Sequence, residues 1–64
     1  MQIEQVKKNL NKMIVYQGKQ NIYRLTACII RRNANGFYYQ AELQDTKCNN
    51  SIVYCGLNDI EAEE

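Results

Sequence analysis

The first thirteen residues carry apolar side chains at intervals that fit a helix. The apolar positions are three or four residues apart, at Ile3, Val6, Leu10 and Met13. Glu4 lies near the start of the segment and Lys7 near its end, the favourable order for a helix dipole. The pattern predicts a helix over residues 2–12. Because so short a helix is unstable alone, its apolar side must pack on another element.

From Met13 onward the pattern changes to short β-prone runs separated by polar turns. The expected strands are residues 13–16, 22–32, 37–44 and 51–55, with a last short strand at 60–62. The expected turns are 17–20, where Gly18 would take a positive φ, and 33–36, which contains an Asn-Gly pair. Residues 45–50 form a polar loop. In residues 37–44, Phe37 and Tyr39 alternate with Tyr38 and Gln40, which is typical of a strand with one buried face.

The register of the predicted hairpin depends on the length of its turn. A three-residue loop, Ala34-Asn35-Gly36, would pair Ile29 with Ala41 and bury Leu25, Ala27 and Ile29 together. A loop of even length would place Cys28 and Ile30 on that face instead. We favour the odd loop, although Ile30 then needs cover from another element such as the N-terminal helix.

A helix followed by four or five short strands predicts a mainly β (α+β) domain, a small and strongly bent antiparallel sheet or barrel. The order of strands, the Asn-Gly hairpin and the segment SIVYC-GLNDIE resemble an SH3-like barrel over residues 13–62. In that fold a short helical turn separates the last two strands, and Gly56–Ile60 is similar to it. The chain lacks the ALYDY-like opening, paired tryptophans and groove proline of peptide-binding SH3 domains, so recognition of proline-rich peptides is not expected.

The whole chain also resembles small orphan proteins of phages and mobile elements in low-GC Gram-positive bacteria. That resemblance lies in length, composition and style. It implies a small inhibitor or accessory protein that binds a host protein, such as a defence enzyme, in the host cytoplasm.

Length and charge restrict the possible functions further. A chain of 64 residues forms a single domain with a small core, whose acidic end at residues 63–64 is expected to fray. The net charge of +1 divides unevenly, with +6 over residues 1–32 and −5 over residues 33–64. Nucleic-acid-binding domains are usually more basic overall. No apolar stretch has the length of a membrane span, and the N-terminus lacks the apolar core of a secretion signal, so a cytoplasmic protein is expected.

The residue types also argue against catalysis and metal binding. Histidine is absent, which removes the commonest general base and metal ligand. The three cysteines, Cys28, Cys48 and Cys55, include no CxxC pair, and Cys28 and Cys55 lie in apolar runs that suggest burial. Cys48 lies in a polar stretch and is expected to be exposed. We therefore expect no enzyme, no cofactor and no metal.

The candidate binding residues are one aromatic and several charged side chains. They are Tyr38, Arg31, Arg32, Arg24, Lys8, Lys12 and Glu61. Tyr38 should point away from the core and lie beside an arginine, where it could anchor a partner or simply shield the hairpin. The lysines of the helix, Lys7 included, would join the arginines in one basic surface if the helix packed near the hairpin. Tyr16, Tyr23 and Tyr54 lie in apolar runs and are expected in the core.

Three functions fit these residues. The first is a non-catalytic protein-interaction module. The second is a homo-oligomer that binds and sequesters a small anionic ligand, such as a nucleotide signal, between its subunits. The third is a small barrel that binds nucleic acid, which the near-neutral charge makes less favourable.

Overall fold

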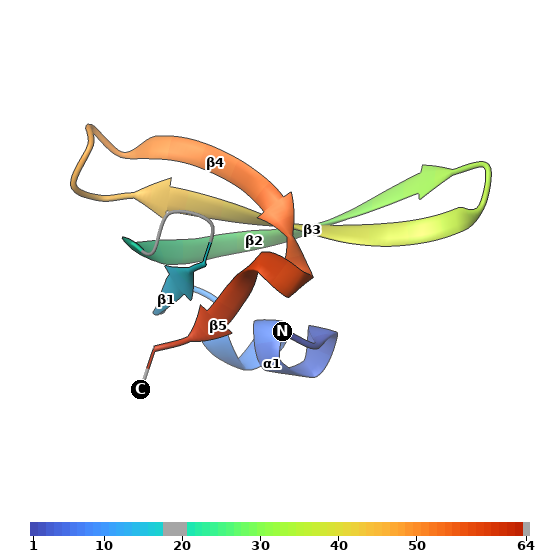
Figure 1. The fold of residues 1–64 in the computed structure, drawn as a ribbon, viewed down its shortest axis with the longest axis horizontal. Coiled ribbons are helices and arrows are strands. Elements are labelled where there is room, and N and C mark those ends of the chain that lie inside the picture. Colours follow the sequence, from blue (N-terminus) through green and yellow to red (C-terminus); the bar gives the residue numbers. More distant parts are fainter. Residues whose placement is uncertain (18–20, 64) are drawn as a thin grey trace.

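The protein is a mainly β domain with one short helix, and its computed structural model describes residues 1–17 and 21–63 (Figure 1). In chain order the elements are α1 (Ile3–Asn9), β1 (Met13–Tyr16), β2 (Asn21–Asn33), β3 (Gly36–Asp45), β4 (Ser51–Gly56), the 3₁₀ helix η1 (Leu57–Asp59) and β5 (Ile60–Ala62). The expected strands and the helical turn before the last strand are confirmed. The expected turn at 17–20 with Gly18, and the end of the frayed tail at Glu64, lie outside the described residues.

The described strands form one antiparallel sheet in the order β4-β3-β2-β1-β5. β1 pairs with β2, β2 with β3 and β3 with β4, and β5 returns to pair with β1. Within the described residues β4 and β5 remain the two edges, so the expected closure into a barrel is not observed. The structure has a strongly bent open sheet, and β4 arches over one side of it in Figure 1.

The predicted register of the β2–β3 hairpin is wrong. Asn33 pairs with Gly36, so the loop contains two residues, and Cys28 lies opposite Ala41. A β-bulge at Thr26 adds one residue to β2 between the pairs Leu25–Leu43 and Ala27–Glu42. Because one extra residue reverses the alternation, the bulge places Leu25 on the same sheet face as Cys28. Ala27 and Ile29, expected in the core, lie on the opposite face.

We call the sheet face that contains the core the inner face. Its buried side chains come from the helix and all five strands: Val6, Ile14, Tyr23, Leu25, Ala41, Leu43, Cys55 and Ile60. The expected burial of Cys55 and Tyr23 is confirmed, and Tyr16 packs edge-on against Tyr23 with ring centroids 5.5 Å apart. Tyr54, in contrast, is 50% exposed on the outer face, so its predicted core position is wrong.

Helix α1 is shorter than predicted, and it covers only part of the inner face. The Gln5 side chain accepts a hydrogen bond from the Gln2 backbone N–H at its start (3.0 Å). The chain leaves the helix after Asn9, and Asn11 adopts a positive φ of 66°. The Asn11 N–H then donates to the carbonyl of Leu25 (2.6 Å), and this bond ties the end of the helix to β2. The shorter helix therefore ends where the chain turns to join the sheet.

The far end of the β2–β3 hairpin projects beyond the rest of the molecule, along its longest dimension (Figure 1). The molecule measures 36 × 23 × 19 Å. β1 pairs with β2 only as far as Arg24, and β4 pairs with β3 only between Gln40 and Asp45. Residues beyond those pairs form a two-stranded ribbon that has no further strand on either side among the described residues. Ribbons of this kind are marginally stable in water when nothing packs on them.

Candidate interaction surface

The projecting hairpin carries large apolar side chains on its inner face. Ile30 is 64% exposed, Phe37 70% and Tyr39 41%. We call these three residues the hairpin row. They continue the line of buried residues on the same face of β2 and β3, past Cys28 and Ala41. The row is therefore an extension of the core that nothing in the described chain covers.

Cross-strand pairing sets the composition of the hairpin row. Ile30 lies directly opposite Tyr39, and Arg32 lies opposite Phe37. The Arg32 guanidinium stands over the Phe37 ring, 5.8 Å from its centroid. This cation–π contact keeps a positive charge beside the apolar tip of the row. Nearer the body, the pair Cys28–Ala41 has small side chains and leaves space between the hairpin and α1.

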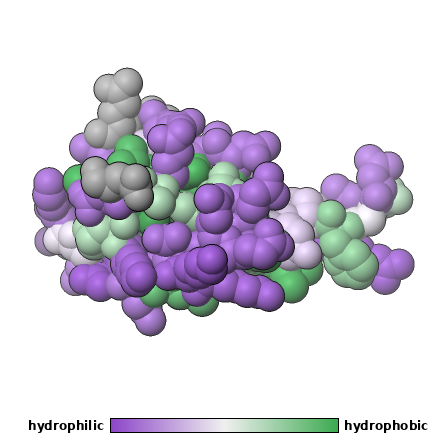
Figure 2. Space-filling view, turned by 90° about the horizontal axis from the view of Figure 1, so that it is seen from below, coloured by the Kyte–Doolittle hydropathy of each residue, from purple (hydrophilic) through white to green (hydrophobic). Residues whose placement is uncertain are grey.

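A groove of about 330 Å³ fills that space, and we call it the helix groove. It is lined by Ile3, Val6, Lys7, Leu10, Cys28, Ile30 and Tyr39. The side of the molecule that includes α1 is seen in Figure 2, where hydrophobic surface lies on the projecting part between a hydrophilic tip and a hydrophilic body. With Leu10 at 39% exposure beside it, the hairpin row forms an apolar patch of roughly 400 Å², a size that is often functional on a monomer.

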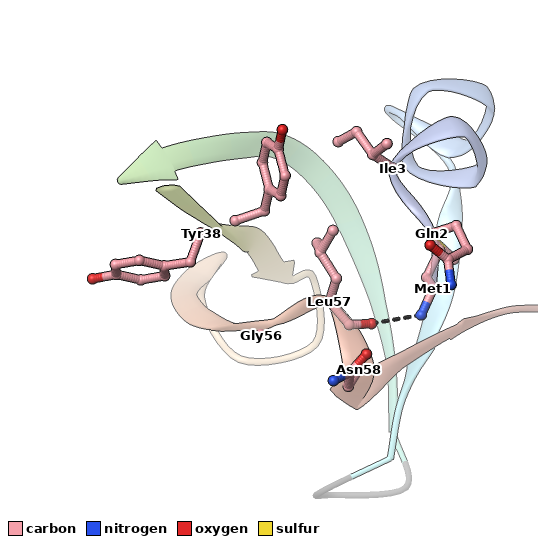
Figure 3. A pocket seen from close by; sticks show the side chains of 8 residues that line it. Met1, Gln2, Ile3, Tyr38, Gly56, Leu57 and Asn58 are labelled. Carbon is pink, nitrogen blue, oxygen red and sulfur yellow. Dashed lines mark hydrogen bonds between the residues drawn. The ribbon is translucent and has the colours of Figure 1, made fainter. Parts of the chain in front are cut away.

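A second hollow of about 380 Å³ adjoins the helix groove (Figure 3). Ile3 and Tyr39 line both, and the remaining lining comes from Met1, Gln2, Tyr38, Gly56, Leu57 and Asn58. The Met1 ammonium donates to the Leu57 carbonyl (2.7 Å), which ties the N-terminus to η1. This hollow is more polar than the groove, and it joins the groove to the end of β4.

Tyr38 and Arg31, two of the predicted binding residues, lie directly opposite each other on the outer face of the hairpin. Both are exposed, and Arg31 Nε donates to the Gln40 side-chain oxygen. Arg32 lies on the inner face with Phe37, because successive residues of a strand alternate between faces. The two arginines therefore do not form one surface, and only the pairing of Tyr38 with an arginine matches the expectation.

The other predicted binding residues are dispersed over the body. Arg24 pairs with Met13 and Gln44 in the sheet, and its Nη1 donates to the carbonyl of Asn11 (3.1 Å). Glu61 lies on β5 opposite Val15. Lys8 and Lys12 are exposed on and after α1, whereas Lys7 is the lysine that lines the helix groove. The single basic surface that the sequence suggested is not formed.

Sequence reasoning missed the hairpin row because it assigned Phe37 and Tyr39 to a buried face. The alternation along β3 was correct, and both residues do lie on the core side of the strand. Alternation cannot tell how far the core extends beneath a strand. One feature of the sequence could have indicated the exposed row: Ile30 required another element, such as the N-terminal helix, to cover it. In the structure α1 reaches only the base of the hairpin.

The structure confirms two of the three predicted cysteine environments, and Cys28 is less buried than expected. Cys55 is buried, Cys28 is half-buried and Cys48 is exposed, and all three are free thiols. Burial raises the pKa of Cys55, with a smaller effect from Asp59, and burial alone raises the pKa of Cys28. These two thiols are therefore protonated and weakly nucleophilic near neutral pH. Among the described residues, no three or more cysteine, aspartate or glutamate side chains gather as a metal site would need.

Residues 1–17 and 21–63 contain no helix with the length and apolar character needed to cross a membrane. Comparison of the chain with known proteins finds no matching family model, curated protein or solved structure.

Proposed function

We propose that this chain is a non-catalytic protein-interaction module that docks on another protein through the hairpin row. The observation that carries the proposal is the exposure of Ile30, Phe37 and Tyr39 on a face that is continuous with the core. The largest apolar patch on a soluble domain is often the site where a partner docks. Aromatic residues beside an arginine are also the side chains most enriched at the centres of protein interfaces.

The strand order supports a finer proposal about the fold. The SH3-like resemblance implies a helical turn between the last two strands, and here a 3₁₀ turn precedes a last strand that returns to pair with the first. We propose that the domain is an opened variant of that architecture. The phage-like style of the chain favours a small inhibitor or accessory protein that acts on a host protein such as a defence enzyme.

Site-specific crosslinking in cells tests the proposed function. A photoreactive benzoyl-phenylalanine replaces Phe37 in one variant and Tyr54 in the other, since both positions are exposed but lie on opposite faces. We expect illumination to attach a discrete protein to the chain from position 37 and not from position 54. Equal adducts at both positions, or none at position 37, would contradict docking through the hairpin row.

A second candidate function, binding of single-stranded nucleic acid, is favoured by the outer face. Tyr38 lies opposite Arg31, and Tyr54 is exposed on the same face. Bases stack on such aromatic side chains beside a cation. Glu42 lies between them and accepts from the Tyr54 hydroxyl (3.3 Å), which places a negative charge on the same face. Anisotropy of labelled oligonucleotides should lose a salt-dependent signal in Tyr38→Ala if this function is correct.

A further inference from the structure

We infer that the helix groove binds an acidic amphipathic helix of the partner protein. This inference rests on the proposed function, because it names the segment that would cover the hairpin row. The groove and the row share Ile30 and Tyr39, so a single ligand covers both. Three features of the structure support this choice. The groove lies on a sheet face rather than a sheet edge, α1 already packs on that face, and the charged residues beside the groove are basic.

The surface is the face of a sheet rather than its edge. Ile30 and Tyr39 stand on the inner face of the hairpin, and Leu10, the residue that follows α1, lines the groove with them. An extended peptide that adds a strand would instead pair with the backbone at a sheet edge. A groove between a helix and a sheet face accepts side chains that project from one side of a ligand. That arrangement suits the apolar side of a helix.

The protein already covers this face with a helix of its own. α1 places Val6 in the core and Ile3 against it, and Leu10 follows at the same helical spacing. α1 is only seven residues long, whereas β2 is thirteen residues long, so the inner face continues beyond the helix. A second helix would extend the same packing along the hairpin. Its apolar residues at positions i, i+3 or i+4 and i+7 would meet Ile30, Tyr39 and Phe37.

The charge at the rim specifies the polar side of the ligand. Of the described residues that line the groove, Lys7 is the charged one, and Arg32 stands over Phe37 at the far end. Acidic residues that flank the apolar stripe of a ligand helix would complement both charges. A second copy of this chain, docked by a two-fold contact, would instead place Lys7 and Arg32 of both copies at one interface. The charge therefore favours an acidic partner over self-association.

Two synthetic peptides test the inference directly. Both have about 16 residues, enough for four helical turns, with leucines at identical helical positions; the remaining residues are glutamate and glutamine in one, lysine and glutamine in the other. Binding to the intact protein is followed by fluorescence anisotropy at low and high salt. We expect the acidic peptide to bind at least about tenfold more tightly than the basic one, and less so at high salt.

Variants assign that binding to the groove. Lys7→Glu should reduce the preference for the acidic peptide by about tenfold or reverse it. Phe37→Ser should weaken both peptides, and Ile30→Ser provides a second substitution on the same face in case the first perturbs folding. Tyr54→Ser, on the outer face, is the matched control and should bind as the wild type does. Circular dichroism verifies that each variant is folded.

The possible outcomes separate the two proposals. Equal affinity for both peptides, or no effect of Lys7→Glu, would overturn the inference that the groove binds an acidic helix. If neither peptide binds but crosslinking from position 37 succeeds, the inference fails and the proposed function stands; if crosslinking fails as well, both fail. Sedimentation equilibrium tests whether a second copy of this chain occupies the groove. A dimer that Phe37→Ser dissociates would identify a second copy as the ligand and overturn the inference.

Discussion

The hydroxyl of Thr26 lies 3.0 Å from the backbone carbonyl oxygen of Glu42 and 2.8 Å from the Oε1 of the same residue. Thr26 is the extra residue of the β-bulge in β2, and Glu42 lies opposite the bulge on β3. The hydroxyl proton thus has two acceptors on a single partner. This contact fixes the point where the alternation of β2 reverses, and so it helps decide which residues of the hairpin share a face with the core.

Removal of that hydroxyl should weaken the hairpin. Thr26→Val keeps the shape and the β-branching of the side chain but leaves the Glu42 oxygens without this donor. We expect a loss of about 1 kcal/mol in the free energy of unfolding, measured by urea denaturation. Thr26→Ser keeps the donor and should lose less. Equal losses in the two variants would show that the hydroxyl has no special role.

The turn of the hairpin depends on a glycine. Gly36 has a φ of +123°, which side-chain-bearing residues rarely adopt, although a Cβ there would meet no atom within 4 Å. Gly36→Ala should therefore cost about 1–3 kcal/mol through backbone strain alone. Gly56 provides the control, because its φ is −74° and an added Cβ would lie 3.7 Å from Asp59. Thermal unfolding of both variants measures these effects, and Gly56→Ala should leave the stability nearly unchanged.

The core should be far more sensitive to truncation than the outer face. Leu25 is fully buried opposite Leu43, so Leu25→Ala should destabilise the fold by about 2–5 kcal/mol. Ile52 lies on the outer face and is 46% exposed, so Ile52→Ala should remain within about 0.5 kcal/mol of the wild type. Urea midpoints of the two variants measure the difference. A large effect at Ile52 would mean that the outer face is covered in solution.

Stability should decline in alkaline solution. Burial raises the pKa of Cys28 and Cys55 above the ordinary value of 9.0, and burial, with a smaller effect of Asp45, raises the pKa of Tyr23 above 10.0. Below about pH 9 these groups are neutral in both the folded and the unfolded chain, so their ionisation does not lower the free energy of unfolding. Above pH 9 the unfolded thiols ionise first, and the folded state loses stability until its own thiols ionise.

Urea midpoints between pH 8 and pH 10.5 would record this decline. Cys55→Ala removes one of the ionising groups and should make the decline shallower, with Cys48→Ala as the exposed control. A midpoint that stays constant or rises over this range would contradict the raised pKa values.

Thiol labelling should separate the three cysteines. Cys48 is exposed, Cys28 is half-buried and Cys55 is buried. A maleimide at neutral pH should modify Cys48 rapidly, whereas Cys28 and Cys55 react on the time scale of local opening and unfolding. Mass spectrometry counts the adducts and should find one at early times and three in denaturant. Fast modification of Cys55 would show that β4 opens readily from the core.

Local pattern was sufficient for the elements themselves. The 3.6-residue spacing of Ile3, Val6 and Leu10 predicted α1, and the alternation from Phe37 to Gln44 predicted β3 with the correct residues toward the core. Helix and strand periods depend only on backbone geometry, so residue spacing reveals them without knowledge of neighbours. The helical turn before β5 was implied by the SH3-like resemblance rather than by local spacing. The mainly β class of the domain followed from these predictions, whereas the expected closure of the sheet into a barrel is not observed.

What the sequence alone determined is therefore which segments form the strands, where a helix lies and which side chains of β3 share a face. The tertiary structure decided the register of β2 and the extent of cover on the inner face. The bulge at Thr26 allows the hairpin to have a two-residue turn and still bury Leu25. No local sequence pattern distinguishes this combination of a bulge and a short turn from an unbulged hairpin with a longer loop. The exposure of Phe37 depends on how far α1 reaches along the hairpin. That reach depends on contacts between distant parts of the chain, since the Asn11–Leu25 hydrogen bond ends the helix region at the base of the hairpin.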